Sequence, residues 1–74
     1  MHLVFKYGGK DKDNLKIHCD VSDKIGDVIA KFHDEHGKIY SKIIIDGDVI
    51  STADYKKSLS ELDIEDEDCL QVRN

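Results

Sequence analysis

One stretch of this chain has the apolar spacing of a helix over two full turns, and that stretch most constrains the fold. Its apolar residues follow the spacing i, i+3, i+4, i+7, which places them on one helix face. They are Ile25, Val28, Ile29 and Phe32. Ser22 or Asp23 is a suitable N-cap, and Gly37 can adopt the left-handed conformation that ends helices. We therefore predict a helix over residues 23 to 36 whose apolar stripe faces a sheet.

Strand patterns lie on both sides of this helix. Residues 1 to 7 and 15 to 19 alternate apolar and polar side chains across a glycine-bearing polar connection, which predicts a first β-hairpin. The β-branched residues 43 to 45 and the pair 49 to 50 flank Asp46-Gly47-Asp48, a turn signal. These two short runs therefore predict a second, tight hairpin.

The last quarter of the chain is less regular. After a polar stretch at residues 51 to 57 come three apolar residues spaced for one helical turn. They are Leu59, Leu62 and Ile64. Residues 69 to 73 alternate again and predict a closing strand. The order ββαββ, short helix, β predicts an α+β fold with one helix across a mixed sheet, in a single domain spanning residues 1–74.

Charge and composition narrow the kind of partner. Eleven Lys and Arg residues stand against 16 Asp and Glu residues, which gives a net charge of -5. This balance repels nucleic-acid phosphates and anionic lipid, so we expect a basic protein partner, no direct nucleic-acid binding and no membrane association. No apolar run is longer than three residues, the length of Ile43-Ile44-Ile45, which is too short for a membrane span. Cys19 and Cys69 predict two reduced, partly buried thiols in an intracellular protein.

Three segments resemble the ubiquitin-like superfamily. Residues 21–37, VSDKIGDVIAKFHDEHG, resemble the cap and helix of ubiquitin without a gap, and residues 43–50, IIIDGDVI, resemble its hairpin. Residues 58–72, SLSELDIEDEDCLQV, resemble SUMO more closely, because Ile64 precedes an acidic turn that runs directly into the last strand. The same pattern closes the SUMO-like domains of the RENi family of genome-maintenance proteins. The resemblance covers the whole chain and implies the ubiquitin-like β-grasp fold.

Two features depart from SUMO itself. A conjugated modifier needs a flexible tail ending in Gly-Gly, because a side-chain-free end must thread the activating enzyme. No such tail follows Val72-Arg73-Asn74, and the segment Ser51 to Ser58 is a few residues longer than in SUMO. We therefore expect a fixed domain rather than a free modifier. A parent sequence continuing past Asn74 to Gly-Gly would instead indicate a processed modifier.

No residue pattern predicts catalysis, a cofactor or a metal. His33 and His36 have the only ligand-like spacing, but no further ligands are arranged near them, so we interpret them as solvent-facing helix histidines. His18 and Cys19 are adjacent on a strand and point to opposite faces, so they form no nucleophile pair. We predict a non-catalytic protein.

The first candidate site is acidic. Carboxylates crowd the segment just before the last strand, at Asp63, Glu65, Asp66, Glu67 and Asp68. In the β-grasp arrangement the Asp46-Gly47-Asp48 turn is expected close by, and clustered carboxylates suit a basic partner. In SUMO the matching loops dock on the back face of the SUMO E2 conjugating enzyme, so the resemblance implies that partner, with Asp68 as the leading contact. The alternative is an acidic turn that is simply solvated.

The second candidate site is apolar. If its two neighbours face the helix, Ile44 lies on the outer face of the sheet, where ubiquitin places its main recognition isoleucine. Val4 is expected to be exposed near the same face, although Gln71 and Arg73 make the patch less apolar than that of ubiquitin. This patch predicts the alternative function, an adaptor domain that binds a ubiquitin receptor or the proteasome.

A third candidate site is the groove between the second strand and the helix, where SUMO takes an extended peptide by strand addition. Lys16, His18 and Lys31 form a thin basic rim for it. The acidic site is the favoured one of the three. It implies non-covalent E2 binding in sumoylation-linked genome maintenance, and the resemblance implies a nuclear location. We expect a monomer, because the edge strand is short and charged.

Overall fold

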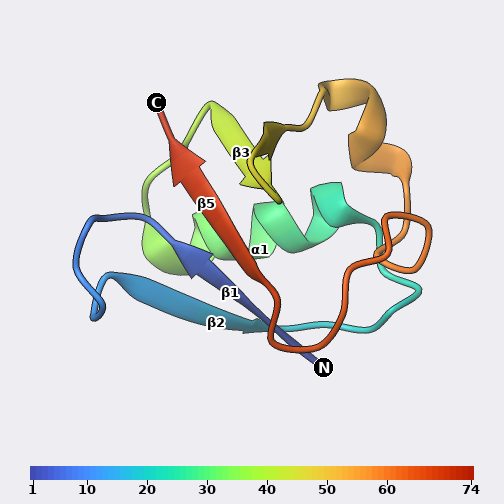
Figure 1. The fold of residues 1–74 in the computed structure, drawn as a ribbon, viewed down its shortest axis with the longest axis horizontal. Helices are drawn as coiled ribbons and strands as arrows, with labels where there is room; N and C mark the ends of the chain where they lie inside the picture. Colours follow the sequence, from blue (N-terminus) through green and yellow to red (C-terminus); the bar gives the residue numbers. More distant parts are fainter.

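Five strands form one mixed sheet, and a single α-helix packs across it (Figure 1). The computed structural model describes all 74 residues. In chain order its elements are β1 (His2–Lys6), β2 (Asn14–His18), α1 (Ile25–His36), β3 (Lys42–Ile45), β4 (Asp48–Val49), the 3-10 helix η1 (Thr52–Lys56) and β5 (Cys69–Arg73). The predicted α+β fold class is confirmed, and the arrangement is that of a β-grasp fold.

The strand order β2-β1-β5-β3-β4 places the last strand in the middle of the sheet. β5 pairs in parallel with β1, with Phe5 opposite Leu70, and antiparallel with β3, with Ile44 opposite Gln71. One end of the sheet therefore gathers the start of β1, the end of β2, the start of β5 and the end of β3. Figure 1 shows the N-terminus at this end and the C-terminus at the other.

The core lies between α1 and the inner face of the sheet. The four predicted stripe residues of α1 are buried, as the spacing required. Phe5 from β1 stacks on Phe32 from α1 with ring centroids 4.5 Å apart, and both side chains are fully buried. Offset aromatic pairs of this kind stabilise a core by about 1 kcal/mol beyond area burial. This contact ties the middle of the sheet to the last turns of the helix.

The helix begins two residues later than predicted. Its N-cap is Lys24, and neither Ser22 nor Asp23 caps it, because the preceding segment pairs with residues 57 to 60 instead. The backbone N–H of Ile25 donates to the carbonyl of Lys57, and the N–H of Leu59 donates to the carbonyl of Asp23. A tertiary bridge thus takes the place of a local cap. At the other end Gly37 has φ of 83° and donates to the His33 carbonyl, as predicted.

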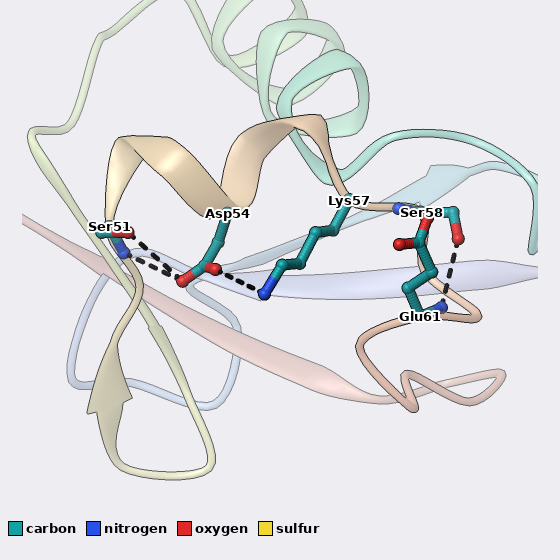
Figure 2. Close-up of polar contacts among 5 residues, drawn as sticks. All are labelled: Ser51, Asp54, Lys57, Ser58 and Glu61. Atoms are coloured by element: carbon teal, nitrogen blue, oxygen red, sulfur yellow. Dashed lines mark hydrogen bonds and ion pairs between the residues drawn. The ribbon is translucent and has the colours of Figure 1, made fainter.

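The 3-10 helix η1 falls in the stretch that the sequence marked only as polar. It packs against the start of α1 so closely that a Cβ on Gly26 would lie 2.9 Å from the carbonyl oxygen of Tyr55. The Asp54 carboxylate holds the segment together (Figure 2): it accepts from the N–H of Ser51 at 3.4 Å and pairs with Lys57 at 3.1 Å. The Lys57 ammonium and these hydrogen bonds lower the pKa of Asp54.

The predicted helical turn at residues 59 to 64 is a run of hydrogen-bonded turns rather than a helix. It contains one helical bond, from the N–H of Leu62 to the carbonyl of Ser58. The Ser58 N–H donates to the Glu61 carboxylate and the Glu61 N–H to the Ser58 hydroxyl (Figure 2). Leu59 and Ile64 are buried, which explains the apolar spacing without a full helix.

Candidate functional site

The tight turn between β3 and β4 presents two carboxylates. Asp46 and Gly47 have φ of 52° and 84°. Positive φ at both central residues is the signature of the type I′ turn, whose twist matches that of a hairpin. Asp46 and Asp48 are exposed. Neither carboxylate has a hydrogen-bond or ion-pair partner within the chain, so both are available to another molecule.

A second turn, residues 65 to 68, is joined to the first residues of β1 through the backbone of His2. The His2 N–H donates to the Asp66 carboxylate at 2.8 Å, and the Glu67 N–H donates to the His2 carbonyl at 2.7 Å. The Val4 N–H donates to the Asp68 carbonyl at 2.9 Å. The turn is therefore an extension of the sheet rather than a loose loop.

Both turns lie at the same end of the sheet. Continuing the β3–β5 register by two residues places Asp46 opposite Cys69, the residue that follows the second turn. The prediction that the two acidic turns come close is thus consistent with the register. We call the segments 46–48 and 65–68 together the acidic end.

The carboxylates of the second turn differ in whether they have a hydrogen-bond or ion-pair partner within the chain. Glu65 has no partner, whereas Glu67 forms an exposed ion pair with Lys16 at 3.2 Å. The His2 backbone N–H is the main cause of a lowered pKa for Asp66, which keeps that group ionised. Asp66 is fully solvent-exposed, so the contact orients the side chain more than it stabilises the fold.

Asp68, the leading contact expected from the sequence, has a structural role. Its side chain is half-buried and accepts a hydrogen bond from the Glu65 N–H at 2.9 Å. One carboxylate oxygen is therefore committed to shaping the turn. Glu65, whose carboxylate is exposed and unpaired, is the better residue for testing docking.

The outer face of the sheet carries the second candidate site. Ile44 lies there, half-buried and opposite Val49, whose side chain is 58% exposed. Val4 was expected to be exposed but is buried, at 9% exposure. Val4 is the outward residue of an inner strand, and its cross-strand neighbours Lys16 on β2 and Cys69 on β5 flank it on both sides.

The basic rim of the third candidate site is already engaged. The Lys31 ammonium donates to the His18 carbonyl at 3.4 Å, spanning from α1 to β2, and Lys16 is turned toward Glu67. Both ammonium groups therefore already have a partner within the chain, which a peptide lying along β2 would have to displace. The groove is therefore the weakest of the three candidates.

The helix histidines are structural rather than solvent-facing, which corrects the expectation for His33 and His36. Both are half-buried. The His33 Nε2 accepts the Tyr40 backbone N–H at 3.1 Å, and the His36 Nε2 lies 3.1 Å from the Tyr40 hydroxyl. Burial, with a smaller contribution from His36, lowers the pKa of His33. A neutral His33 is what this hydrogen bond needs, because a protonated ring has no acceptor.

The two cysteines are unpaired and lie in different environments. Cys19 is buried in the core, and burial raises the pKa of its thiol. Cys69 is exposed on the outer face of β5, so the prediction that both thiols are partly buried is wrong for this residue. Alternation in β5 gives the reason: Leu70 and Val72 point inward, which leaves Cys69 outward.

His2 is the site residue that sequence reasoning missed. It is 64 positions from Asp66, so no local spacing links the two residues, and the link arises only from the parallel pairing of β1 with β5. No family model matches this chain, and no curated protein matches it. None of its helices has the length and apolar character needed to cross a membrane.

Proposed function

We propose that this chain is a non-catalytic, SUMO-like domain that docks through its acidic end on a basic protein surface. The partner that the SUMO-like resemblance implies is the back face of the SUMO E2 conjugating enzyme, in sumoylation-linked genome maintenance in the nucleus. The observation that carries the proposal is the presence of two acidic turns, both fixed by backbone geometry, at one end of the sheet.

The arrangement suits electrostatic docking for a physical reason. Asp46, Asp48 and Glu65 are exposed and have no partner inside the chain, so pairing with arginine or lysine breaks no internal contact. The backbone beneath them is already ordered, which lowers the entropy lost on binding. Clustered charges of one sign also raise the rate of encounter with an oppositely charged surface, and this effect weakens with salt.

Calorimetric titration of the domain into the SUMO E2 enzyme tests this proposal. We expect micromolar or tighter binding that weakens between low and physiological salt. Glu65→Arg should reduce affinity by at least about tenfold, because it reverses a charge that nothing inside the fold uses. Only backbone atoms of Glu65 contribute to the turn, so this variant should still fold.

A matched control separates the site from overall charge. Glu35 on α1 is exposed, and Glu35→Arg makes the same change in net charge. We expect Glu35→Arg to leave the affinity within about twofold of the original, since exposed charges remote from the contact are strongly screened. Equal losses in the two variants, or no E2 binding at all, would contradict docking through the acidic end.

A second function has one specific observation in its favour. The exposed Val49 lies opposite Ile44 on the outer face, and Lys42 and Arg73 point outward beside them. An apolar pair with a basic rim suits an adaptor that binds a ubiquitin receptor or the proteasome. Ile44→Ala would then abolish receptor binding, whereas Glu65→Arg would not affect it.

A further inference from the structure

A cluster of possible metal ligands includes two residues of the turn 65–68 and lies on the side of that turn nearer β2. His2, Asp66 and Glu67 each offer one ligand atom, and these atoms all lie within 4.8 Å of one another. All three side chains are exposed. His18 is the direct cross-strand partner of His2, and the two rings lie 5.1 Å apart between centroids. Two imidazoles distinguish this cluster from a plain acidic turn.

The backbone that carries these side chains is held on both sides of His2. Its N–H donates to Asp66 and its carbonyl accepts from Glu67, while β1 pairs His2 with His18. The Cα positions are therefore fixed by the sheet, and only side-chain rotation is needed to bring the ligand atoms together. Tetrahedral zinc with bond lengths near 2.1 Å needs ligand atoms about 3.4 Å apart, so each exposed side chain has to move by little more than 1 Å.

We propose that His2, Asp66 and Glu67, with His18 as a fourth ligand after rotation of its ring, form a surface site for Zn²⁺. Imidazole nitrogen favours zinc and neighbouring transition metals over Mg²⁺ and Ca²⁺, which prefer oxygen ligands alone. One oxygen of Asp66 accepts the His2 N–H, which leaves the other oxygen for the metal. The proposal does not depend on the docking function, because its probe is the metal ion alone.

The Lys16 ammonium competes with a metal ion for the Glu67 carboxylate. Its ammonium pairs with the Glu67 carboxylate at 3.2 Å and must leave before that carboxylate binds a cation. Replacing Lys16 with Gln removes the competitor without removing a ligand. Zinc affinity should therefore rise several-fold in Lys16→Gln, a result that a merely structural effect of the substitution would not produce.

The test is calorimetric titration of zinc chloride into the chain prepared without an affinity tag, together with thermal unfolding in zinc and in a chelator. We expect one zinc per chain and a higher melting temperature in zinc, because a ligand that binds only the folded state stabilises it. His2→Ala should weaken binding by more than about tenfold, since even the loss of an outer-shell partner costs a metal site that much. His18→Ala should weaken it by less.

Two further variants keep the proposal falsifiable. Glu67 has φ of 67°, so Glu67→Gly removes a ligand and also relieves backbone strain, and lost zinc binding in this variant does not reflect unfolding. Asp48→Asn makes a charge change at the other acidic turn and should leave zinc affinity unchanged. The proposal is wrong if the original chain binds no zinc at millimolar concentration, if His2→Ala binds as tightly as the original, or if Mg²⁺ binds equally well.

Discussion

The two ends of the sheet are built by different means. At the acidic end, backbone hydrogen bonds and two turns with positive φ set the structure, and charged side chains project into water. At the opposite end, which we call the aromatic end, the rings of Tyr7, Phe32, His33, His36 and Tyr40 pack on one another. Tyr40 is 9% exposed and belongs to the hydrophobic core, whereas no carboxylate of the acidic end does.

This difference separates stability from binding. Ring burial and His–Tyr hydrogen bonds at the aromatic end contribute folding free energy, since buried aromatic rings dominate core energetics. Exposed carboxylates contribute little to folding and are therefore open to a partner. Substitutions at the aromatic end should thus lower the free energy of unfolding, whereas charge changes at the acidic end should alter binding with little effect on stability.

The largest expected effect is at Tyr40. Tyr40→Ala removes a nearly buried ring that packs against Phe32 and His36, and we expect it to lower the free energy of unfolding by about 3 kcal/mol or more. Tyr40→Phe keeps the ring and loses only the hydroxyl contact with His36, so about 1 kcal/mol is expected. Denaturant unfolding measures both. A loss below about 1 kcal/mol for Tyr40→Ala would contradict the claim that ring burial at the aromatic end stabilises the fold.

At the acidic end the largest stability effect should come from the backbone. Gly47 has φ of 84° and no atom near the position of an added Cβ, so Gly47→Ala measures backbone strain alone. We expect a loss of about 1 to 2 kcal/mol. Gly9→Ala is the control, because Gly9 has open space and no positive φ. Similar unfolding curves for the two variants would contradict a positive φ at Gly47.

Lowering the pH should reduce the stability of the domain in two steps, first through His33 at the aromatic end and then through Asp66 at the acidic end. The pKa of His33 is lowered from its ordinary value of 6.5, so between that value and the folded-state pKa the unfolded chain binds more protons than the folded one. Stability should therefore be highest above pH 6.5 and fall as the pH drops. The lowered carboxyl pKa of Asp66 acts later, since its contribution is present above 3.8 and lost below it.

Unfolding curves measured from pH 7.5 to 3 test this order. His33→Gln lacks the titrating ring, so the stability of this variant should fall less as the pH drops below 6.5. Asp66→Asn should change the pH dependence of stability only in the most acid range, below 3.8. A first loss of stability that persists unchanged in His33→Gln would place its origin elsewhere.

The smallest effect concerns the thiols. Cys69 is exposed and Cys19 is buried with a raised pKa, so an alkylating reagent at neutral pH should modify Cys69 and leave Cys19 intact in the folded domain. Mass spectrometry of digested samples distinguishes the two sites. Equal labelling would show that the β2–α1 region opens more readily than its packing indicates.

Local patterns in the sequence predicted most of the elements. The helix stripe, the Asp46-Gly47 turn and the Gly37 stop each depend on residues within a few positions of one another, and all three are present. Long-range contacts could not be predicted in this way. The late helix start depends on pairing with residues 57 to 60, and the burial of Val4 depends on its place on an inner strand between Lys16 and Cys69.

The candidate site was predicted in outline but not in detail. Runs of carboxylates are visible in any sequence, so the acidic end was found. Which carboxylates are already engaged was not visible, because the partners of Asp66 and Glu67 are His2 and Lys16 on distant strands. The sequence alone therefore favours Asp68 as the leading contact, although its side chain accepts the Glu65 N–H.

The most direct test of docking through the acidic end is to follow the backbone amide signals of the labelled domain by NMR while the SUMO E2 enzyme is added. We predict that the largest shifts fall on residues 46 to 48 and 65 to 68, with the outer face around Ile44 and Val49 little changed. Shifts centred on Ile44 and Val49, or none at all, would contradict the proposed docking mode.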